Sequence, residues 1–307
     1  DLFIIGQFDG VDSITAVSIG SQIMHMITVM IVGLSMGATV CIAQAVGAKD
    51  KEKLRYCIGN TVTVFFIVSL LLTCLLLFFT DFIVDVVKTP AEAVSGTKDY
   101  LIICFIGIPL ITAYNIVSSI LRGMGDSKSP MYFIAIACVA NIILDYVFIG
   151  YFKLGAVGAA LGTTLSQGIS VICALTYINR NNSSDSFSFA YLKLKGNIAK
   201  RLLRIGIPIC AQDGFIQVAF MVITVIANMR GLTDAAAVGI VEKLISFIFL
   251  VPSSMLSTVS AMGAQNIGAG KIDRAKQTLR YAIYITFIFG VIVGILFQFI
   301  AENALEL

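Results

Sequence analysis

Two polar residues, Asn141 and Asp145, lie near the middle of a long apolar segment, residues 130–152. Their spacing of four places both side chains on one face of a helix, one turn apart. An ionisable group at the centre of a membrane-spanning helix costs roughly 2.5 to 3.5 kcal/mol even on insertion scales. The presence of a carboxyl group despite this cost indicates a functional role. The alternatives are polar packing between two helices, or an Asp145 side chain that reaches Lys153 at the membrane edge.

A second carboxyl group, that of Asp1, is predicted at the same depth as Asp145. Asp1 stands eight residues before the polar turn at Asp9, and Asp145 stands seven residues before Phe152. At a rise of 1.5 Å per residue, both carboxyl groups lie about 10–12 Å below one membrane surface. Neither has a basic residue near it on its own helix, so we expect them to face a shared pocket rather than lipid.

The segment that follows opens with three closely spaced small residues, Gly155, Gly158 and Gly162. Small residues at this spacing let two helices approach closely. The approach would bring Thr163, and with it Thr164 and Gln167, toward the preceding helix. A carboxylate, an amide and a hydroxyl in a dry pocket can hold a proton or a sodium ion, so protonation of Asp145 can act as a switch.

The composition indicates a multi-spanning membrane protein. Of 307 residues, 58% are hydrophobic and 13% charged, and the mean hydropathy is +0.95; soluble domains have about 25% charged residues. The seven cysteines stand singly, without a C-x-x-C pair, and there is one histidine, so neither disulfides nor a metal site is expected. No nucleotide-binding or hydrolase motif is present, and no signal peptide is recognised. We expect no enzyme, no cofactor and no nucleic-acid partner.

Apolar segments of about the length that a helical crossing needs recur along the chain. Residues 1–8 are predicted to be the end of a further helix whose start is missing. Pro109 and Pro252 fall inside spans and are predicted to kink them. The sequence therefore predicts an all-α polytopic membrane protein, with eight full spans at residues 17–46, 56–80, 100–121, 130–152, 156–178, 205–229, 235–262 and 281–301.

The basic residues indicate the orientation. When the connections alternate between the two sides, 16 of the 21 Lys and Arg residues fall on one side. That side is cytoplasmic by the positive-inside rule. It includes the polar segment 180–197, which separates two predicted units. We expect a multi-pass protein of a bacterial cytoplasmic membrane.

An internal repeat supports this division. A shift of 221 residues aligns residues 10–48 with 231–269 without a gap, and both copies end in Q-x-x-G-A, at Gln44 and Gln265. Chance similarity of apolar helices is the alternative. Six crossings separate the copies, so the repeats are predicted to be parallel. The predicted domains are an N-terminal lobe (1–179), a cytoplasmic linker (180–197) and the first three helices of a C-terminal lobe (198–307). An intact protein would then have about twelve helices.

Two further sets of polar residues are weaker indicators of function. The segment 123–126 (GMGD) resembles the G-x-G-D of intramembrane aspartyl proteases, but Asp126 lies in a loop before Asp145 instead of in a helix after it. Near the start of the seventh helix, Gln212, Asp213 and Gln217 either line a substrate path or are polar helix-end residues.

Several segments jointly resemble the multidrug and toxic compound extrusion (MATE) transporters, in particular the bacterial branch similar to the DNA-damage-inducible protein F. The resemblance covers essentially the whole chain. It is carried by DLFIIGQFDG with DSITAVSIG, GLSMGATVCIAQAVGAKD, LRGMGDSKSP, ANIILDYVFI with GAVGAALGTTLSQ, and AQNIGAGKIDRAKQTLR.

The resemblance implies two six-helix lobes around a cavity, and export of drugs, often organic cations, against an inward flow of protons or sodium ions. It places a cation site at the four matching positions, Asp1, Asn141, Asp145 and Thr163. One branch has an acidic residue in the seventh helix. Here Gln212 and Gln217 stand in that region, so a second-lobe cation site is not predicted.

The function predicted from these features is secondary active efflux by alternating access, driven by a proton or a sodium ion. Its expected partners are small organic substrates and the lipid bilayer, and the expected state is a monomer. A flippase for lipid-linked sugars, from the same superfamily, is the alternative. It would be expected to line its cavity with several basic residues, and no predicted span carries Lys or Arg in its middle. An intramembrane aspartyl protease is less favoured.

Overall fold

The computed structural model describes residues 1–180, 191–192 and 194–305, which are almost entirely helical. Most of the predicted linker lies outside the described residues. A 3-10 turn (Ala91–Ala93) precedes α5, and a π-helical turn (Tyr146–Tyr151) follows α7. The helices are α1 (Leu2–Phe8), α2 (Val11–Gly47), α3 (Lys51–Phe78), α4 (Thr80–Val86), α5 (Val94–Ile106), α6 (Ile108–Met124), α7 (Lys128–Asp145), α8 (Gly155–Arg180), α9 (Gly196–Arg230), α10 (Leu232–Gly268) and α11 (Ile272–Leu305).

The predicted all-helical membrane architecture is confirmed. Seven of the described helical segments are long and apolar enough to cross a bilayer, and residues 91–124, which are bent by 46° between α5 and α6, make up to eight if this pair is counted as one span. The bend falls beside Pro109, as predicted, because proline cannot donate the backbone hydrogen bond that would continue α5 into α6. In contrast, α10 passes through Pro252 as one unbroken helix.

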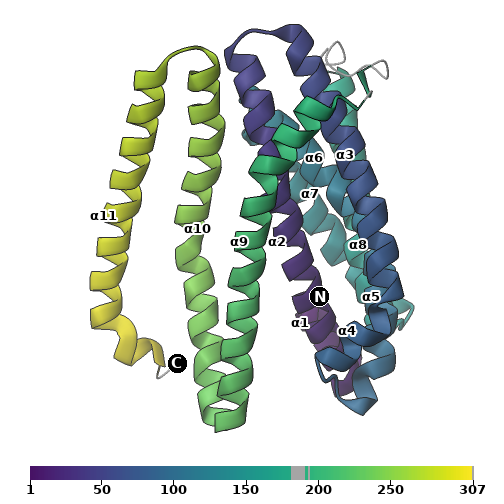
Figure 1. Ribbon diagram of the computed structural model, residues 1–307. Coiled ribbons are helices and arrows are strands. Elements are labelled where there is room, and N and C mark those ends of the chain that lie inside the picture. Colours follow the sequence, from purple (N-terminus) through teal and green to yellow (C-terminus); the bar gives the residue numbers. More distant parts are fainter. Residues whose placement is uncertain (181–190, 193, 306–307) are drawn as a thin grey trace.

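Two groups of helices are distinguished here by their order along the chain, α1–α8 before residues 181–190 and α9–α11 after them, and α9 lies across α2 (Figure 1). Helix α2 lies at the centre and packs against α3, α5, α6, α9 and α10. The connections after α2 and α10 lie at one end of the bundle, here called the basic end because of Lys49, Lys51 and Lys271. The α9–α10 connection lies at the opposite end.

Glycines bring α2 and α9 into backbone contact. A Cβ atom on Gly37 would clash with the carbonyl oxygen of Leu202, and one on Gly206 would clash with that of Leu34. In lipid, where apolar burial does not drive helices together, such small-residue contacts allow the close packing that holds helices. The two groups are therefore joined by direct backbone packing along this pair.

The two copies of the Q-x-x-G-A motif contact each other at the basic end. A Cβ on Gly47 would clash with the carbonyl oxygen of Gln265, and a Cβ on Gly268 would clash with that of Gln44. The Gln265 Nε2 also donates to the Gly123 carbonyl at 3.0 Å. Helices α2 and α10 run in the same direction (Figure 1), as a parallel repeat requires. The symmetry axis of the repeat stays a prediction.

We expect Gly47→Ala and Gly268→Ala each to lower the midpoint of thermal unfolding in detergent. The added methyl group forces α2 and α10 apart, and overpacking of this kind costs about 1–3 kcal/mol. The control is Gly263→Ala on α10, where no other described heavy atom lies within 4 Å of an added Cβ; it should leave the midpoint unchanged or raise it. Equal midpoints for all three variants would contradict the reciprocal contact.

Candidate functional site

Asp145 ends α7, at the point where the helix changes to the π-helical turn. Such turns are rare and often mark functional sites. The Asp145 side chain has 0% exposure. A Cβ on Gly162 of α8 would clash with its Oδ1 atom, so a side chain at this position would displace the carboxyl group. The close approach predicted from the glycine spacing is present.

The four residues predicted for the cation site meet in one place, although they come from α7, α8 and the start of α1. Thr163 Oγ1 donates a hydrogen bond of 3.1 Å to Asp1 Oδ2. The Asp1 main-chain nitrogen lies 3.5 Å from Asp145 Oδ2, an atom without a hydrogen-bond partner among the described residues. Asn141 lies 3.4 Å from Asp145 Oδ1. The contacts agree with the predicted shared pocket; its cation-binding role stays a prediction.

The amide of Asn141 lies between the two carboxyl groups, and its orientation follows from the hydrogen-bond network. In one orientation, its nitrogen donates to Asp145 Oδ1 at 3.4 Å, while its oxygen faces Asp1 Oδ1. In the other, its nitrogen donates to Asp1 Oδ1 at 3.0 Å and its oxygen accepts from the Thr163 backbone N–H at 3.2 Å. The second orientation has better hydrogen-bond distances but turns the amide oxygen toward Asp145.

Each orientation therefore leaves one carboxyl oxygen facing the amide oxygen. Two acceptor atoms attract each other only when a proton or a cation lies between them. The oxygen atoms of Asp1, Asn141 and Asp145 are of the kind that a proton or a hard cation can bridge.

Tyr100 of α5 is a neighbour of the site that the sequence analysis missed. Its side chain is 2% exposed and lies beside Thr163 and Cys104. A buried tyrosine hydroxyl requires a polar partner. A tyrosine inside an apolar segment therefore indicates a polar group nearby, and this signal was present in the sequence. Thr164 lies against Gly107, at the break between α5 and α6; its predicted approach to α7 stays a prediction.

The structure separates the three residues predicted for a substrate path. Asp213 packs against α2, where a Cβ on Gly33 would lie 2.5 Å from its Oδ2. Gln217 lines a pocket between the two helix groups. Gln212 is exposed and does not line that pocket. The substrate role of all three stays a prediction.

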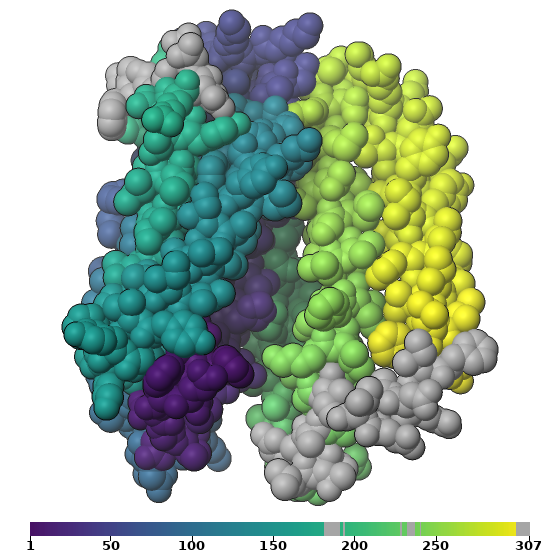
Figure 2. Space-filling model, turned by 180° about the vertical axis from the view of Figure 1, so that it is seen from behind, coloured from purple at the N-terminus to yellow at the C-terminus, as the bar shows by residue number. Residues whose placement is uncertain are grey.

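The pocket that contains Gln217 has a volume of about 410 Å³ and is lined mainly by α2, α9 and α10. Figure 2 shows a hollow between α10 and the N-terminal helices. One wall carries Glu242, whose Oε1 accepts a 2.6 Å hydrogen bond from Thr224 Oγ1. Sequence analysis did not select Glu242. The signal was available, because Glu242 is an acidic residue within the predicted span 235–262, just as Asp145 is within its own span.

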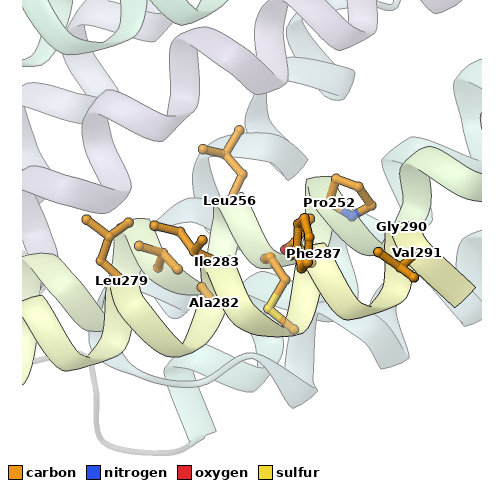
Figure 3. A pocket seen from close by; sticks show the side chains of 11 residues that line it. Pro252, Leu256, Leu279, Ala282, Ile283, Phe287, Gly290 and Val291 are labelled. Atoms are coloured by element: carbon orange, nitrogen blue, oxygen red, sulfur yellow. The ribbon is translucent and has the colours of Figure 1, made fainter.

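A second hollow, of about 660 Å³, lies between α10 and α11 and contains no charged side chain. Its wall is apolar except for Thr286, with Pro252, Leu256, Ile283 and Phe287 facing it (Figure 3). An apolar wall offers nothing to bind an ion, so this groove is a packing surface and not a part of the cation site.

Asp126 has a structural role that differs from that of a protease acid. Its carboxylate accepts hydrogen bonds from Ser129 Oγ at 2.6 Å and Tyr177 at 3.1 Å. Partial burial acts to raise the pKa of Asp126, but the hydrogen bonds from Ser129, Tyr177 and the Lys128 backbone outweigh it and lower the pKa. Nineteen residues separate Asp126 from Asp145, or about 28 Å along α7. The two carboxyl groups cannot form a catalytic pair.

Comparisons with known proteins identify relatives along the whole chain. The family model described as MatE matches residues 1–147 and 208–307. The Probable multidrug resistance protein YoeA of Bacillus subtilis (strain 168) is 31% identical over 99% of this chain and 67% of its own length. The Multidrug export protein MepA of Staphylococcus haemolyticus is 27% identical over 92% of this chain and 62% of its own length.

The fold comparison agrees with the sequence comparison. A crystal structure described as MATE in the bent conformation superposes with a TM-score of 0.90 at 23% identity, over 99% of this chain and 69% of that chain. The chain thus spans about two thirds or less of the length of the curated relatives named above.

We expect Gly162→Ala to abolish cation binding without removing any polar group, because the methyl group displaces the Asp145 carboxyl. The measurement is the rise in thermal unfolding midpoint on adding sodium ions or protons. A ligand at 100 times its Kd adds about 2.7 kcal/mol in the wild type. The control is Gly168→Ala on the same helix, whose Cβ would make an ordinary 3.5 Å contact with Leu110. A full cation response in Gly162→Ala would contradict the site.

Proposed function

The chain belongs to the MatE family of multidrug and toxic compound extrusion transporters, and from that premise we propose that it is part of a secondary active exporter of drugs and other lipophilic, often cationic, compounds. Inward movement of a proton or a sodium ion drives the export. The names of the two relatives, which describe multidrug resistance and multidrug export, support the efflux role.

The observation that carries the proposal is the oxygen–oxygen contact at Asn141. Whichever way the amide points, its oxygen faces one carboxyl oxygen of Asp1 or Asp145, and a positive charge between the two oxygens would stabilise that contact. The proton or sodium ion provides that charge. When it leaves, the two carboxylates and the amide lose their common partner, and the free energy of this arrangement rises. Loading and unloading of the site therefore favour different arrangements of the helices around it.

The energy available to such a cycle is adequate. One elementary charge that moves through a membrane potential of 100 mV releases roughly 2.3 kcal/mol. A difference of 1.4 kcal/mol already changes an equilibrium tenfold. One coupling ion for each cycle is therefore enough to shift the balance between two conformations of the transporter.

The helix packing supports alternating access. The contacts between Gly47 and Gln265 and between Gly268 and Gln44 close the basic end, while the polar pocket lies nearer the opposite end of α2 and α10. We place the basic end in the cytoplasm, so the conformation faces outward. The return to the inward-facing state separates α2 from α10 at these glycines.

The flippase alternative has less support. A site for the phosphates of a lipid-linked sugar would be expected to present several basic residues. The pocket is lined by one lysine, Lys243, and also by the acidic residue Glu242. The cation site supports an ion-coupled exporter instead.

The direct test is transport by the full-length protein in proteoliposomes. Efflux of a fluorescent lipophilic cation is measured under an imposed proton gradient, an imposed sodium gradient, or neither. Export that follows one of the two gradients supports the proposal and identifies the coupling ion. Export that is independent of both gradients would overturn it.

We expect Asp145→Asn to reduce gradient-driven export more than tenfold, which corresponds to about 1.4 kcal/mol or more. The substitution keeps the size and polarity of the side chain, so insertion and folding remain near normal, but the neutral amide cannot hold the coupling ion. Asp99→Asn on the exposed face of α5 is the matched control and should export normally. Wild-type export by Asp145→Asn at equal expression would show that the carboxyl is only structural.

A further inference from the structure

We propose that a cluster of two basic and two aromatic side chains at the basic end binds the phosphate headgroup of an anionic phospholipid. The cluster consists of Arg55, Tyr56, Tyr191 and Lys195. It lies where the start of α9 runs beside α3 (Figure 1). The inference goes beyond the proposed function, because lipid binding requires neither an ion gradient nor a transported substrate.

The chain just before α9 docks on α3 at a glycine. A Cβ on Gly59 would clash with the carbonyl oxygen of Tyr191. Thr63 Oγ1 donates a hydrogen bond of 2.8 Å to the next carbonyl oxygen of the docked chain. Asn60 Oδ1 accepts one of 2.8 Å from the backbone N–H of Lys195. These backbone contacts fix the side chains of Tyr191 and Lys195 against α3.

At this contact, two cations lie on two tyrosine rings. The guanidinium carbon of Arg55 is 5.6 Å from the centre of the Tyr191 ring, and Lys195 Nζ is 3.1 Å from the centre of the Tyr56 ring. The two rings pack edge to face, with their centres 5.1 Å apart. An aromatic face attracts a cation without cancelling its charge. The cluster therefore keeps two positive charges close together.

Acidic side chains do not neutralise these charges in the part of the chain that the structure describes. Its ion pairs of 4.0 Å or less lie elsewhere, at Asp145 and at Asp81. Glu52 stands one turn before Arg55 on α3, but it is exposed and belongs to neither pair. Residues 186–212 include no Asp or Glu. Because like charges repel, an anion that contacts both cations is bound favourably.

The donors of the cluster suit a phosphate group. An arginine guanidinium can donate two parallel hydrogen bonds to phosphate oxygens, and a lysine ammonium adds a point charge. Arg55 also donates to the Tyr191 hydroxyl at 3.3 Å, which leaves the hydroxyl hydrogen free for a phosphate oxygen. Lys195 is exposed, and the other three side chains are half-buried. A headgroup can therefore reach these donors from outside the helix bundle.

The neighbouring surface of α3 favours a lipid over a free phosphate ion. Ile67 and Leu70 continue the helix face that carries Tyr56 and Thr63, and they are 44% and 43% exposed. Tyr56 begins the predicted span 56–80, so these two residues lie deeper in the membrane than the cluster. Basic and aromatic side chains at the membrane surface bind headgroups, and an apolar helix face below them contacts the acyl chains.

The test is lipid binding to the full-length protein in detergent, measured by native mass spectrometry. The probes are phosphatidylglycerol, phosphatidylcholine with the same acyl chains, and inorganic phosphate. We expect phosphatidylglycerol to bind at least tenfold more tightly than phosphatidylcholine, because the choline cation is repelled by the two basic side chains. Inorganic phosphate has no acyl chains and should displace the lipid only at concentrations at least tenfold higher.

Three variants assign the binding to the cluster. Arg55→Gln and Lys195→Gln should each weaken phosphatidylglycerol binding about fivefold, the usual contribution of one basic residue near a membrane surface. Gly59→Ala should weaken it without removing a charge, because the methyl group displaces the docked chain from α3. The controls are Lys271→Gln, at an exposed position of the basic end, and Gly263→Ala, which adds a Cβ with no listed neighbour within 4 Å. Unfolding midpoints show whether each variant is folded.

An equal loss of affinity in Lys271→Gln and in the cluster variants would reveal only a general attraction to the basic end, and would overturn the inference. Unchanged affinity in Arg55→Gln, Lys195→Gln and Gly59→Ala would do the same. Displacement of the lipid by an equal concentration of inorganic phosphate would overturn the assignment to a phospholipid. None of these results bears on the proposed function, since export can follow an ion gradient whether or not this cluster binds lipid.

Discussion

A fully buried carboxyl group inside a helix bundle is the constraint on which the first helix group depends. Removing a carboxylate from water costs several kcal/mol unless a proton, a cation or hydrogen bonds compensate. Asp145 is fully buried, and one of its oxygens has no hydrogen-bond partner among the described residues. The nearby amide of Asn141 cannot satisfy both acidic residues at once. In the proposed function, a proton or a cation bound in this pocket compensates that cost.

Glycine allows the contacts that the rest of the fold requires. Gly162 admits the Asp145 carboxyl against α8, Gly37 and Gly206 bring α2 onto α9, and Gly47 with Gly268 brings α2 onto α10. The contacts of Gly37, Gly206, Gly47 and Gly268 are with backbone carbonyl oxygens, so they cannot adjust by a change of rotamer, whereas Gly162 faces the side chain of Asp145. A larger residue at any of the first four positions moves a helix. The same kind of contact positions the site and closes the basic end.

Much of this could be predicted from the sequence, for physical reasons. The positions of the apolar spans follow from the thickness of a membrane. The bend near Pro109 follows from the backbone N–H that proline lacks. The approach of α8 to α7 follows from the spacing of Gly158 and Gly162. Polar residues buried in apolar segments identified the cation site. The same criterion would have selected Glu242. The surroundings of Thr164 could not be predicted, because they depend on the bend of the chain at Gly107, whereas the need of a buried Tyr100 for a polar partner could have been.

In the proposed cycle, α1 is the element that joins the cation site to the pocket. The Asp1 side chain accepts a hydrogen bond from Thr163 in the site, whereas the next residue, Leu2, lines the pocket. Ile5 is fully buried, so α1 cannot move independently of the core of the first group, and Phe8 contacts Tyr146 in the π-helical turn directly after Asp145. Coupling between two ligands requires that each has a different binding free energy in the two states of a shared element. In the proposed cycle, the segment that carries Asp1 in the site and Leu2 at the pocket is suited to this role, because both ligands contact it.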